Sequence, residues 1–414
     1  MDQNVSEEPW TLAKKIVFRF FFVYLVFYTF PYPFYFPGYP DLDLIALLFS
    51  LANKVFGLGN EIWTGFSGDG EFGYTQILYR VVLALLATAF WSGLDRKRPN
   101  YATLARFALV QARFFLAAAM MWYGWAKVFK AQFPDPGLVR MLQPIGELSP
   151  MGLIWTFMGY SAGYTILAGI AEVVGGALIL FRRTTTLGAL ILTGVMGNVV
   201  AMNLFYDVPV KIYAIHLFLI ALGLLLLDWR QLTAIFMSHR ATQPVHFTPY
   251  FSDKRLIWAR RLLKTLLIGY FMLFTNIVAG LDNKDYWEQK PELYGIYEVE
   301  SFTLDGVERI PLVTDSIRWQ HFIVDKVMAG SRNMRGVVKR WRVKIDSEKK
   351  TMTLTARMGP DRLVITYEAP DQDSLILHCE LDGKTVVMRT RRVEKEFVLL
   401  NRGFHWINEV PFNP

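Results

Sequence analysis

The sequence contains very little cysteine, since Cys379 is the only one among 414 residues. One cysteine excludes an internal disulfide, a cysteine-based metal site and a dithiol redox pair within the chain. The six histidines form neither a Glu-x-x-His nor a His-Glu-x-x-His motif, so the metal motifs of di-iron bundles and zinc proteases are missing. A Walker-type phosphate-binding loop is missing as well. Sequence motifs therefore do not identify an enzyme, and whether the chain catalyses a reaction stays open.

Charged residues are also few, at 19% of the chain, whereas 53% of the residues are hydrophobic and the mean hydropathy is +0.26. This composition is too apolar for an ordinary soluble enzyme, and apolar runs of about 20 residues are typical of membrane helices. The net charge of +8 comes from Lys and Arg clustered in short segments between those runs. Such clusters are typical of loops on one side of a membrane. We therefore predict a lipid bilayer as the environment and no nucleic-acid partner.

The apolar runs predict an α-helical integral membrane bundle of about seven spans. We expect these spans at residues 16–30, 75–94, 104–130, 161–181, 187–206, 208–228 and 262–281. An amphipathic run at residues 42–56 is expected to lie on the bilayer surface. With the N-terminus in the cytoplasm, the basic segments all fall inside, as the positive-inside rule requires. The prediction is a bacterial inner (cytoplasmic) membrane protein with an extracytoplasmic C-terminal domain; an interfacial last span would instead leave that domain in the cytoplasm.

From residue 283 onwards the long apolar runs stop, and apolar and polar residues alternate. Turn signals such as Asp305-Gly306 and Asp382-Gly383 separate seven or eight short strands, which predicts an antiparallel meander. Closure would remove exposed strand edges, so a lipocalin-like barrel is the preferred form, with an open sheet or a sandwich as the alternative. Four segments are predicted: N-terminal spans at 1–103, a four-helix core at 104–228, a basic connector with the last span at 229–282, and the β domain at 283–414.

Glu172 is the most informative polar residue of the core, because a carboxylate within a membrane span is costly and needs a partner. The small residues Ala168 and Gly176 let a neighbouring helix approach it closely. On the third span, Arg113 is expected to lie deep and to pair with Glu172, whereas Lys127 is expected near the outer end. Such a pair is either a structural tie between two helices or part of a site for a substrate or quinone.

Three further residues complete the candidate site. Asn198, in the fifth span, is of a type that forms hydrogen bonds between membrane helices. His216, in the sixth span, is either a proton carrier near neutral pH or a neutral, hydrogen-bonded core residue. Trp125 belongs to an aromatic cluster that fits an interfacial belt or a stacking surface for a flat ring such as a quinone. The candidate ligand-binding set is Arg113, Lys127, Glu172, Asn198, His216 and Trp125.

Three segments of the core carry a family resemblance: Tyr123-Gly124-Trp125-Ala126-Lys127-Val128-Phe129, the loop with Pro134 and Pro144, and Gly169-Ile170-Ala171-Glu172-Val173-Val174-Gly175-Gly176 ahead of Arg182-Arg183. They resemble the DoxX-like membrane proteins over residues 104–228. The resemblance implies a four-helix membrane module, associated in some members with quinone-linked sulfur oxidation or oxidative-stress complexes. It also implies that Lys127 and Glu172 are shared polar positions. The extra spans and the β domain depart from the minimal family pattern, so thiosulfate oxidation does not transfer directly.

Two functions follow from these features. The first is a redox-associated subunit that binds a quinone or similar lipid-soluble ligand in the helical core. The second is a non-enzymatic anchor or scaffold whose outer β domain binds a protein partner or a small ligand. A transporter is less well supported, because no inverted repeat and no paired broken helices are evident. The tail at residues 402–409 is expected to fold back on the barrel or the bilayer through Phe404 and Trp406, or else to form the mouth of a ligand site.

Overall fold

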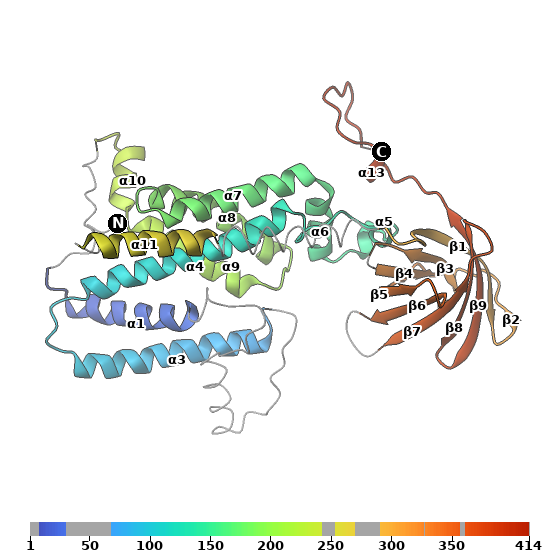
Figure 1. Cartoon of the computed structure of the whole chain (residues 1–414), viewed down its shortest axis with the longest axis horizontal. Helices are drawn as coiled ribbons and strands as arrows, with labels where there is room; N and C mark the ends of the chain where they lie inside the picture. The colour runs from blue at the N-terminus through green and yellow to red at the C-terminus, as the bar shows by residue number, and fades with distance from the viewer. Residues whose placement is uncertain are drawn as a thin grey trace. The chain divides into compact units, whose positions relative to one another are not determined.

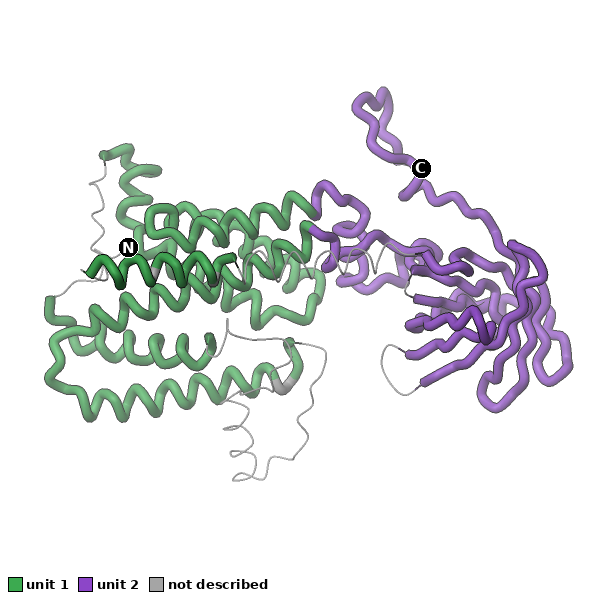
Figure 2. The backbone as a smooth tube through the Cα atoms, in the orientation of Figure 1, with its two compact units in different colours: residues 1–128, 166–279 green, residues 129–165, 280–414 purple. Residues whose placement is uncertain are grey.

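A computed structural model describes residues 8–29, 68–241, 253–269, 290–326, 328–356 and 361–413. The expected surface helix at 42–56, and the part of the last predicted span after residue 269, lie outside these residues. The chain separates into two compact units, which are residues 1–128 with 166–279 and residues 129–165 with 280–414 (Figure 2).

The first unit is built from helices (Figure 1). They are α1 (Leu12–Thr29), α3 (Glu71–Leu94), α4 (Ala102–Val128), α7 (Ala162–Leu180, whose first turn belongs to the second unit), α8 (Thr185–Phe205), α9 (Lys211–Leu226), α10 (Trp229–Phe236) and α11 (Lys254–Ile268). Buried apolar side chains of α4, α7, α8 and α9 form one continuous hydrophobic cluster. The predicted helical core is therefore confirmed.

The described residues contain part of the predicted set of about seven spans. Within the described residues, four helices are long and apolar enough to cross a membrane: Gly73–Leu94, Ala102–Val128, Ala162–Leu180 and Thr185–Phe205. The α9–α10 pair qualifies as a fifth only if it is one span bent by 70°. The charges of Lys14, Lys15 and Arg19 keep α1 from qualifying, and the described part of α11 is rich in Lys and Arg. The helix that covers most of the first predicted span therefore carries three charges.

The second unit contains a β domain of nine strands. They are β1 (Gly295–Leu304), β2 (Val307–Glu308), β3 (Trp319–Val324), β4 (Met328–Asn333), β5 (Val338–Asp346), β6 (Thr351–Ala356), β7 (Arg362–Glu368), β8 (Ser374–Leu381) and β9 (Lys384–Val393). The strands pair antiparallel, and β9 closes onto β1 from Ile296 to Leu304. β2 pairs only with the end of β1, so eight strands form the closed barrel. The predicted barrel is confirmed, and an open sheet or a sandwich is excluded.

Apolar side chains from all eight strands meet inside the barrel in one cluster, and most of them are large. Phe302, Phe322 and Met352 are completely buried there, at 0% exposure. The rings of Trp319 and Trp341 lie in the same cluster with their centroids 5.9 Å apart. Alternation of inward and outward residues, with a period of two, produces this core.

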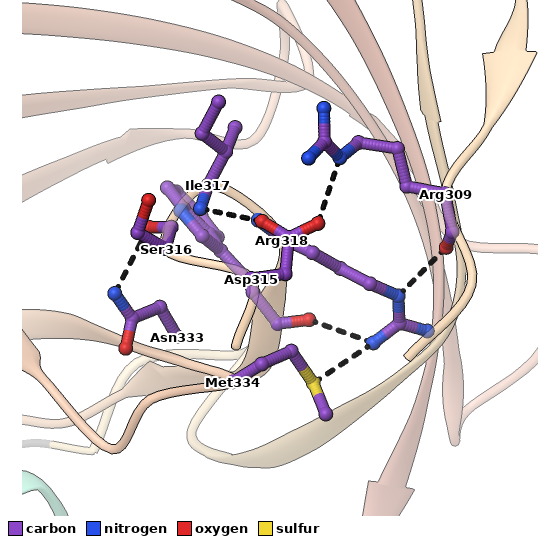
Figure 3. A network of polar contacts seen from close by, with 8 residues as sticks. Arg309, Asp315, Ser316, Ile317, Arg318, Asn333 and Met334 are labelled. Atoms are coloured by element: carbon purple, nitrogen blue, oxygen red, sulfur yellow. Dashed lines mark hydrogen bonds and ion pairs between the residues drawn. The ribbon is translucent and has the colours of Figure 1, made fainter. Parts of the chain in front are cut away.

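Arg318 ties the start of β3 to its neighbours (Figure 3). Its side chain is buried and donates to the carbonyl oxygens of Arg309 at 3.0 Å and Val299 at 3.1 Å. Burial lowers the pKa of Arg318. Burial opposes ionisation of Asp315 as well, but backbone N–H groups and the Arg309 guanidinium hold the pKa of Asp315 below its usual value. Because these donors are satisfied by carbonyl and carboxylate oxygens of the barrel, the network has a structural role.

The loop between α4 and α7 belongs to the same compact unit as the barrel. It contains α5 (Leu138–Met141), the 3₁₀ turn η2 (Ile145–Glu147) and α6 (Pro150–Tyr160). Val139 and Leu142 form a buried cluster with Ile296 and Ile323. The compact units therefore divide the chain differently from the four predicted segments, because the apolar face of α5 packs on the barrel.

Candidate functional site

Lys127 and Glu172 form an ion pair between α4 and α7. The Lys127 Nζ atom lies 2.9 Å from Oε1 and 2.8 Å from Oε2 of Glu172. The two side chains are only 8% and 3% exposed. Both charged groups are shielded from water. Each one stabilises the other, because a single buried charge without its partner would strongly destabilise the fold. The expectation that Glu172 is neutralised by a basic group of the adjoining helix is thus confirmed.

Close contact between the two helix backbones makes this pairing possible. A Cβ atom at Gly169 would lie 2.5 Å from the carbonyl oxygen of Gly124 and 2.9 Å from Cβ of Lys127. A Cβ atom at Gly176 would lie 3.1 Å from Cβ of Met120, so the predicted role of Gly176 is confirmed. Small residues therefore allow α7 to come near enough for a lysine on α4 to reach its carboxylate.

Arg113 does not have the role that the sequence suggested. Its side chain is buried and donates to the carbonyl oxygens of Ile179 and Leu180, each at 2.9 Å. Lys264 of α11 donates to the same Leu180 oxygen at 2.7 Å. Arg113 is fourteen residues before Lys127, which is about 21 Å along a helix, so it reaches the C-terminal end of α7 and not Glu172 in its middle. There the two cations complement unpaired carbonyls and the negative end of the helix dipole.

His216 belongs to a separate aromatic cluster. Its Nδ1 lies 2.7 Å from the carbonyl oxygen of Ile212, and its Nε2 lies 2.6 Å from the hydroxyl of Tyr24. The imidazole stacks on the ring of Tyr28 at 4.1 Å. Both ring nitrogens have partners within the fold, which agrees with the hydrogen-bonded alternative for this residue.

Trp125 and Asn198, the two remaining candidates, have other surroundings. Trp125 is partly buried against the hydrophobic cluster of the bundle. Asn198 is on an exposed face of α8, where its amide lies 3.6 Å from the sulfur of Met202. Of the six predicted site residues, the structure thus joins Lys127 to Glu172 and gives the other four different surroundings.

Aromatic rings lie beside the ion pair. The Lys127 ammonium is 5.7 Å from the centre of the Tyr123 ring, a distance at which a cation and a ring face attract each other. The Tyr123 ring is in turn 6.0 Å from that of Tyr213 on α9. The Tyr123 side of the pair is therefore lined by flat, polarizable groups.

Two further charged residues have structural roles that the sequence did not indicate. Arg19, inside the first predicted span, is 1% exposed and donates to Ser92 Oγ at 2.7 Å and to the carbonyl oxygen of Asp95 at 2.8 Å. Asp69 accepts the backbone N–H groups of Lys211 and Ile212, at 2.6 and 2.9 Å, and so caps α9. The residues joined by these hydrogen bonds are 73 to 143 positions apart in the chain, so no local sequence pattern predicts the contacts.

A G-x-S-x-G match at residues 159–163 has no catalytic geometry. A nucleophile elbow requires a strand, a sharp turn and a helix. Here the match lies between α6 and α7, and the Ser161 hydroxyl accepts the N–H of Tyr164 at 3.3 Å. Ser161 therefore caps the first turn of α7.

Comparison with known proteins identifies the family. The DoxX family model matches residues 108–207, which contain the Lys127–Glu172 pair. The uncharacterized protein YwoB of Bacillus subtilis (strain 168) is 33% identical over 133 residues, which cover 30% of this chain and 79% of YwoB. No solved structure matches the chain. The chain is therefore a member of the DoxX family of membrane proteins.

Proposed function

We propose that this protein is a membrane-anchored scaffold whose helices carry a β-barrel that binds a protein partner outside the membrane. The packing of α5 on the barrel is the observation that carries the proposal. Asp325 accepts the N–H groups of Leu138 and Val139 and so caps α5. A Cβ atom at Gly137 would lie 2.0 Å from Asp325 Oδ2, so only glycine fits there. The loop between α4 and α7 thus has buried polar and apolar contacts with the barrel. Such contacts are expected if the helices hold the barrel in place.

The filled interior of the barrel favours binding on its outer surface. Side chains from all eight strands occupy the interior, among them Phe302, Phe322 and Trp341. Small barrels that hold a ligand keep room for it, whereas a packed interior is a core. We therefore assign partner binding to an outward face.

A basic row across β5, β6 and β7 is the face that fits a partner best. The strand register aligns Arg342 with Thr355 and Thr355 with Arg362, so the two arginines are roughly 10 Å apart, which is two strand spacings. Lys344 is the next outward residue on β5, and all three cations are exposed. Within the described parts of the chain, no ion pair or hydrogen bond occupies these three side chains. Their charge complements an acidic protein surface.

Two contacts support the predicted orientation. The barrel packs on the loop that enters α7 at its N-terminal end. Lys264, near the start of the C-terminal region, bonds to Leu180 at the other end of α7. If α7 spans the bilayer, Lys264 and the loop on which the barrel packs belong to opposite ends of that span. This agrees with an extracytoplasmic barrel and a cytoplasmic N-terminus in a bacterial inner membrane.

The test is charge reversal in the full-length protein. Native membranes containing the Arg342→Glu/Arg362→Glu variant are cross-linked, and the captured partner is compared with that of the unsubstituted chain. We expect the variant to lose at least tenfold of the cross-linked partner. The unsubstituted chain should show a similar loss at high salt, because salt screens the attraction between exposed charges.

The matched control is Lys384→Glu/Arg389→Glu, which reverses two exposed cations on β9. It should leave capture unchanged. Equal loss in both variants would show that net charge, and not this face, controls capture. Undiminished capture by the Arg342→Glu/Arg362→Glu variant would exclude the proposed surface.

A quinone site in the helical core is the second candidate. Its supporting observation is that Lys127 has three N–H groups, of which the two hydrogen bonds to Glu172 use two. The remaining donor and the Tyr123 ring suit a carbonyl-bearing flat molecule. A bound quinone would supply electron-transfer chemistry, while Lys127 would hold one of its carbonyl oxygens.

The quinone candidate is tested by purification. Lipid extracts of the purified protein are analysed for quinones, and tryptophan fluorescence is followed during titration with ubiquinone and menaquinone. Quinone in the extract, and quenching that Lys127→Met weakens at least tenfold, would support the site. An extract without quinone, together with no saturable quenching, would exclude it.

A further inference from the structure

The C-terminal tail after the barrel displays large apolar side chains. It comprises α13 (Val398–Asn401) and the residues up to 413. Phe404 is 82% exposed, Trp406 87% and Ile407 79%. The described residues leave both Phe404 and Trp406 largely uncovered, so the expected contact with the barrel is wrong, whereas the expected contact with the bilayer stays a prediction. A contiguous exposed patch of this kind marks an interaction surface.

The tail is folded into a loop with a polar neck and an apolar tip. Arg402 donates to Asn408 Oδ1 at 2.6 Å, and Asn408 donates to the carbonyl oxygen of His405 at 3.1 Å. Gly403, with φ of +67°, supplies the turn at the neck. Phe404 and Trp406 contact each other edge to face, with ring centroids 5.9 Å apart. The hydrogen bonds thus close a small loop on which both rings are exposed.

The same loop lies beside the outer end of a membrane helix. A cleft of about 530 Å³ is lined by Tyr160, Ser161 and Ala162 together with tail residues from Leu400 to Asn408. Ala162 is the first residue of α7, one of the helices apolar enough to cross a membrane. Both sides of the cleft belong to the second compact unit. The tail therefore lies next to the first residue of α7, which is the end of the helix that would meet the bilayer surface if α7 crosses the membrane.

We propose that residues 402–408 form a membrane-insertion loop, with Phe404, Trp406 and Ile407 entering the interfacial region of the lipid. Trp and Phe are enriched in that region, and a cation beside them can contact lipid phosphate. Arg402 at the neck is such a cation. The loop gives the barrel a second attachment to the bilayer, in addition to the spans. This inference does not depend on the partner or quinone proposals.

The experiment uses the full-length protein in nanodiscs of phosphatidylcholine and phosphatidylglycerol. His405→Cys is labelled with bimane, so that the neighbouring Phe404 and Trp406 are retained. Cys379 stays unlabelled near pH 7, because burial raises the pKa of its thiol to about 12. The control is Lys349→Cys, at a barrel turn where the lysine side chain is 77% exposed. Unsubstituted protein is treated alike to measure background labelling.

Lipids with a nitroxide near the head group are the quencher. The label at position 405 should be quenched at least twofold relative to plain lipid, whereas the label at 349 should not change. Phe404→Ser/Trp406→Ser should abolish the quenching, while Val307→Ser/Ile310→Ser, which removes exposed apolar groups from the barrel, should not. Equal quenching at 405 and 349, or a blue-shifted label that lipid nitroxides do not reach, would overturn the proposal. The second result would mean that protein covers the tip.

Discussion

Removing one member of the Lys127–Glu172 pair should destabilise the helical core far more than removing both. Lys127→Met leaves the Glu172 carboxylate, 3% exposed, without its ammonium partner. Breaking a buried pair in this way costs about 3–5 kcal/mol, whereas replacing both charges by apolar residues of similar size is often neutral or stabilising. We therefore expect Lys127→Met to lose about 3–5 kcal/mol and Lys127→Met/Glu172→Leu to regain most of it.

The assay is equilibrium unfolding in mixed micelles, followed by circular dichroism while the SDS fraction rises. The four proteins of a double-mutant cycle give the coupling energy directly. A matched control cycle uses Arg98 and Asp95, whose side chains are 51% and 30% exposed, and for which coupling below about 1 kcal/mol is expected. Additive effects of the two core substitutions would refute the reasoning, because they would show that neither charge depends on the other.

Three further predictions concern packing and pH. Gly169→Ala should lower stability by about 1–3 kcal/mol in the same assay because of overpacking, whereas Gly194→Ala, with open space around it, should be neutral or stabilising by up to about 1 kcal/mol. Burial raises the pKa of Asp325. The melting temperature of the barrel should therefore fall as pH rises from the usual aspartate range through that raised pKa. In Asp325→Asn the melting temperature should not show this fall. Gly330→Ala, whose Cβ would lie 2.9 Å from Val139 Cγ2, should increase hydrogen exchange in α5, and an unchanged exchange rate would contradict the proposed docking.

The repeating parts of the fold were predictable, because periodicity is a local property. The apolar runs of α4, α7 and α8 gave their helices to within a few residues. The Asp-Gly pairs gave hairpin turns, and both Asp305 and Gly306 do adopt positive φ. Whether a helix crosses the membrane was harder to predict from the length and end charges of an apolar run. The run at residues 16–30 predicts a span, but it contains Arg19, whose side chain is buried within the protein.

The site was only partly predictable, because pairing in a bundle depends on where helices cross. The cost of a carboxylate in lipid correctly predicted a basic partner for Glu172. Depth along α4 favoured Arg113, but the crossing of Gly124 and Gly169 brings Lys127 to Glu172 instead. The docking of α5 on the barrel has no sequence signal, since its contacts join segments about 150 to 190 residues apart.

The arrangement of charge along α7 indicates that these cations hold the helix in place. Lys127 binds it at Glu172 in its middle, and Arg113 with Lys264 binds carbonyl oxygens at its C-terminal end. One variant separates this role from ligand binding. Lys127→Met/Glu172→Leu should keep the fold, and capture of an acidic partner by the barrel should stay within about twofold of the unsubstituted protein. The variant could instead lose the partner while its unfolding transition matches that of the unsubstituted protein. This result would mean that the ion pair has a functional role, and it would favour the quinone candidate over the scaffold.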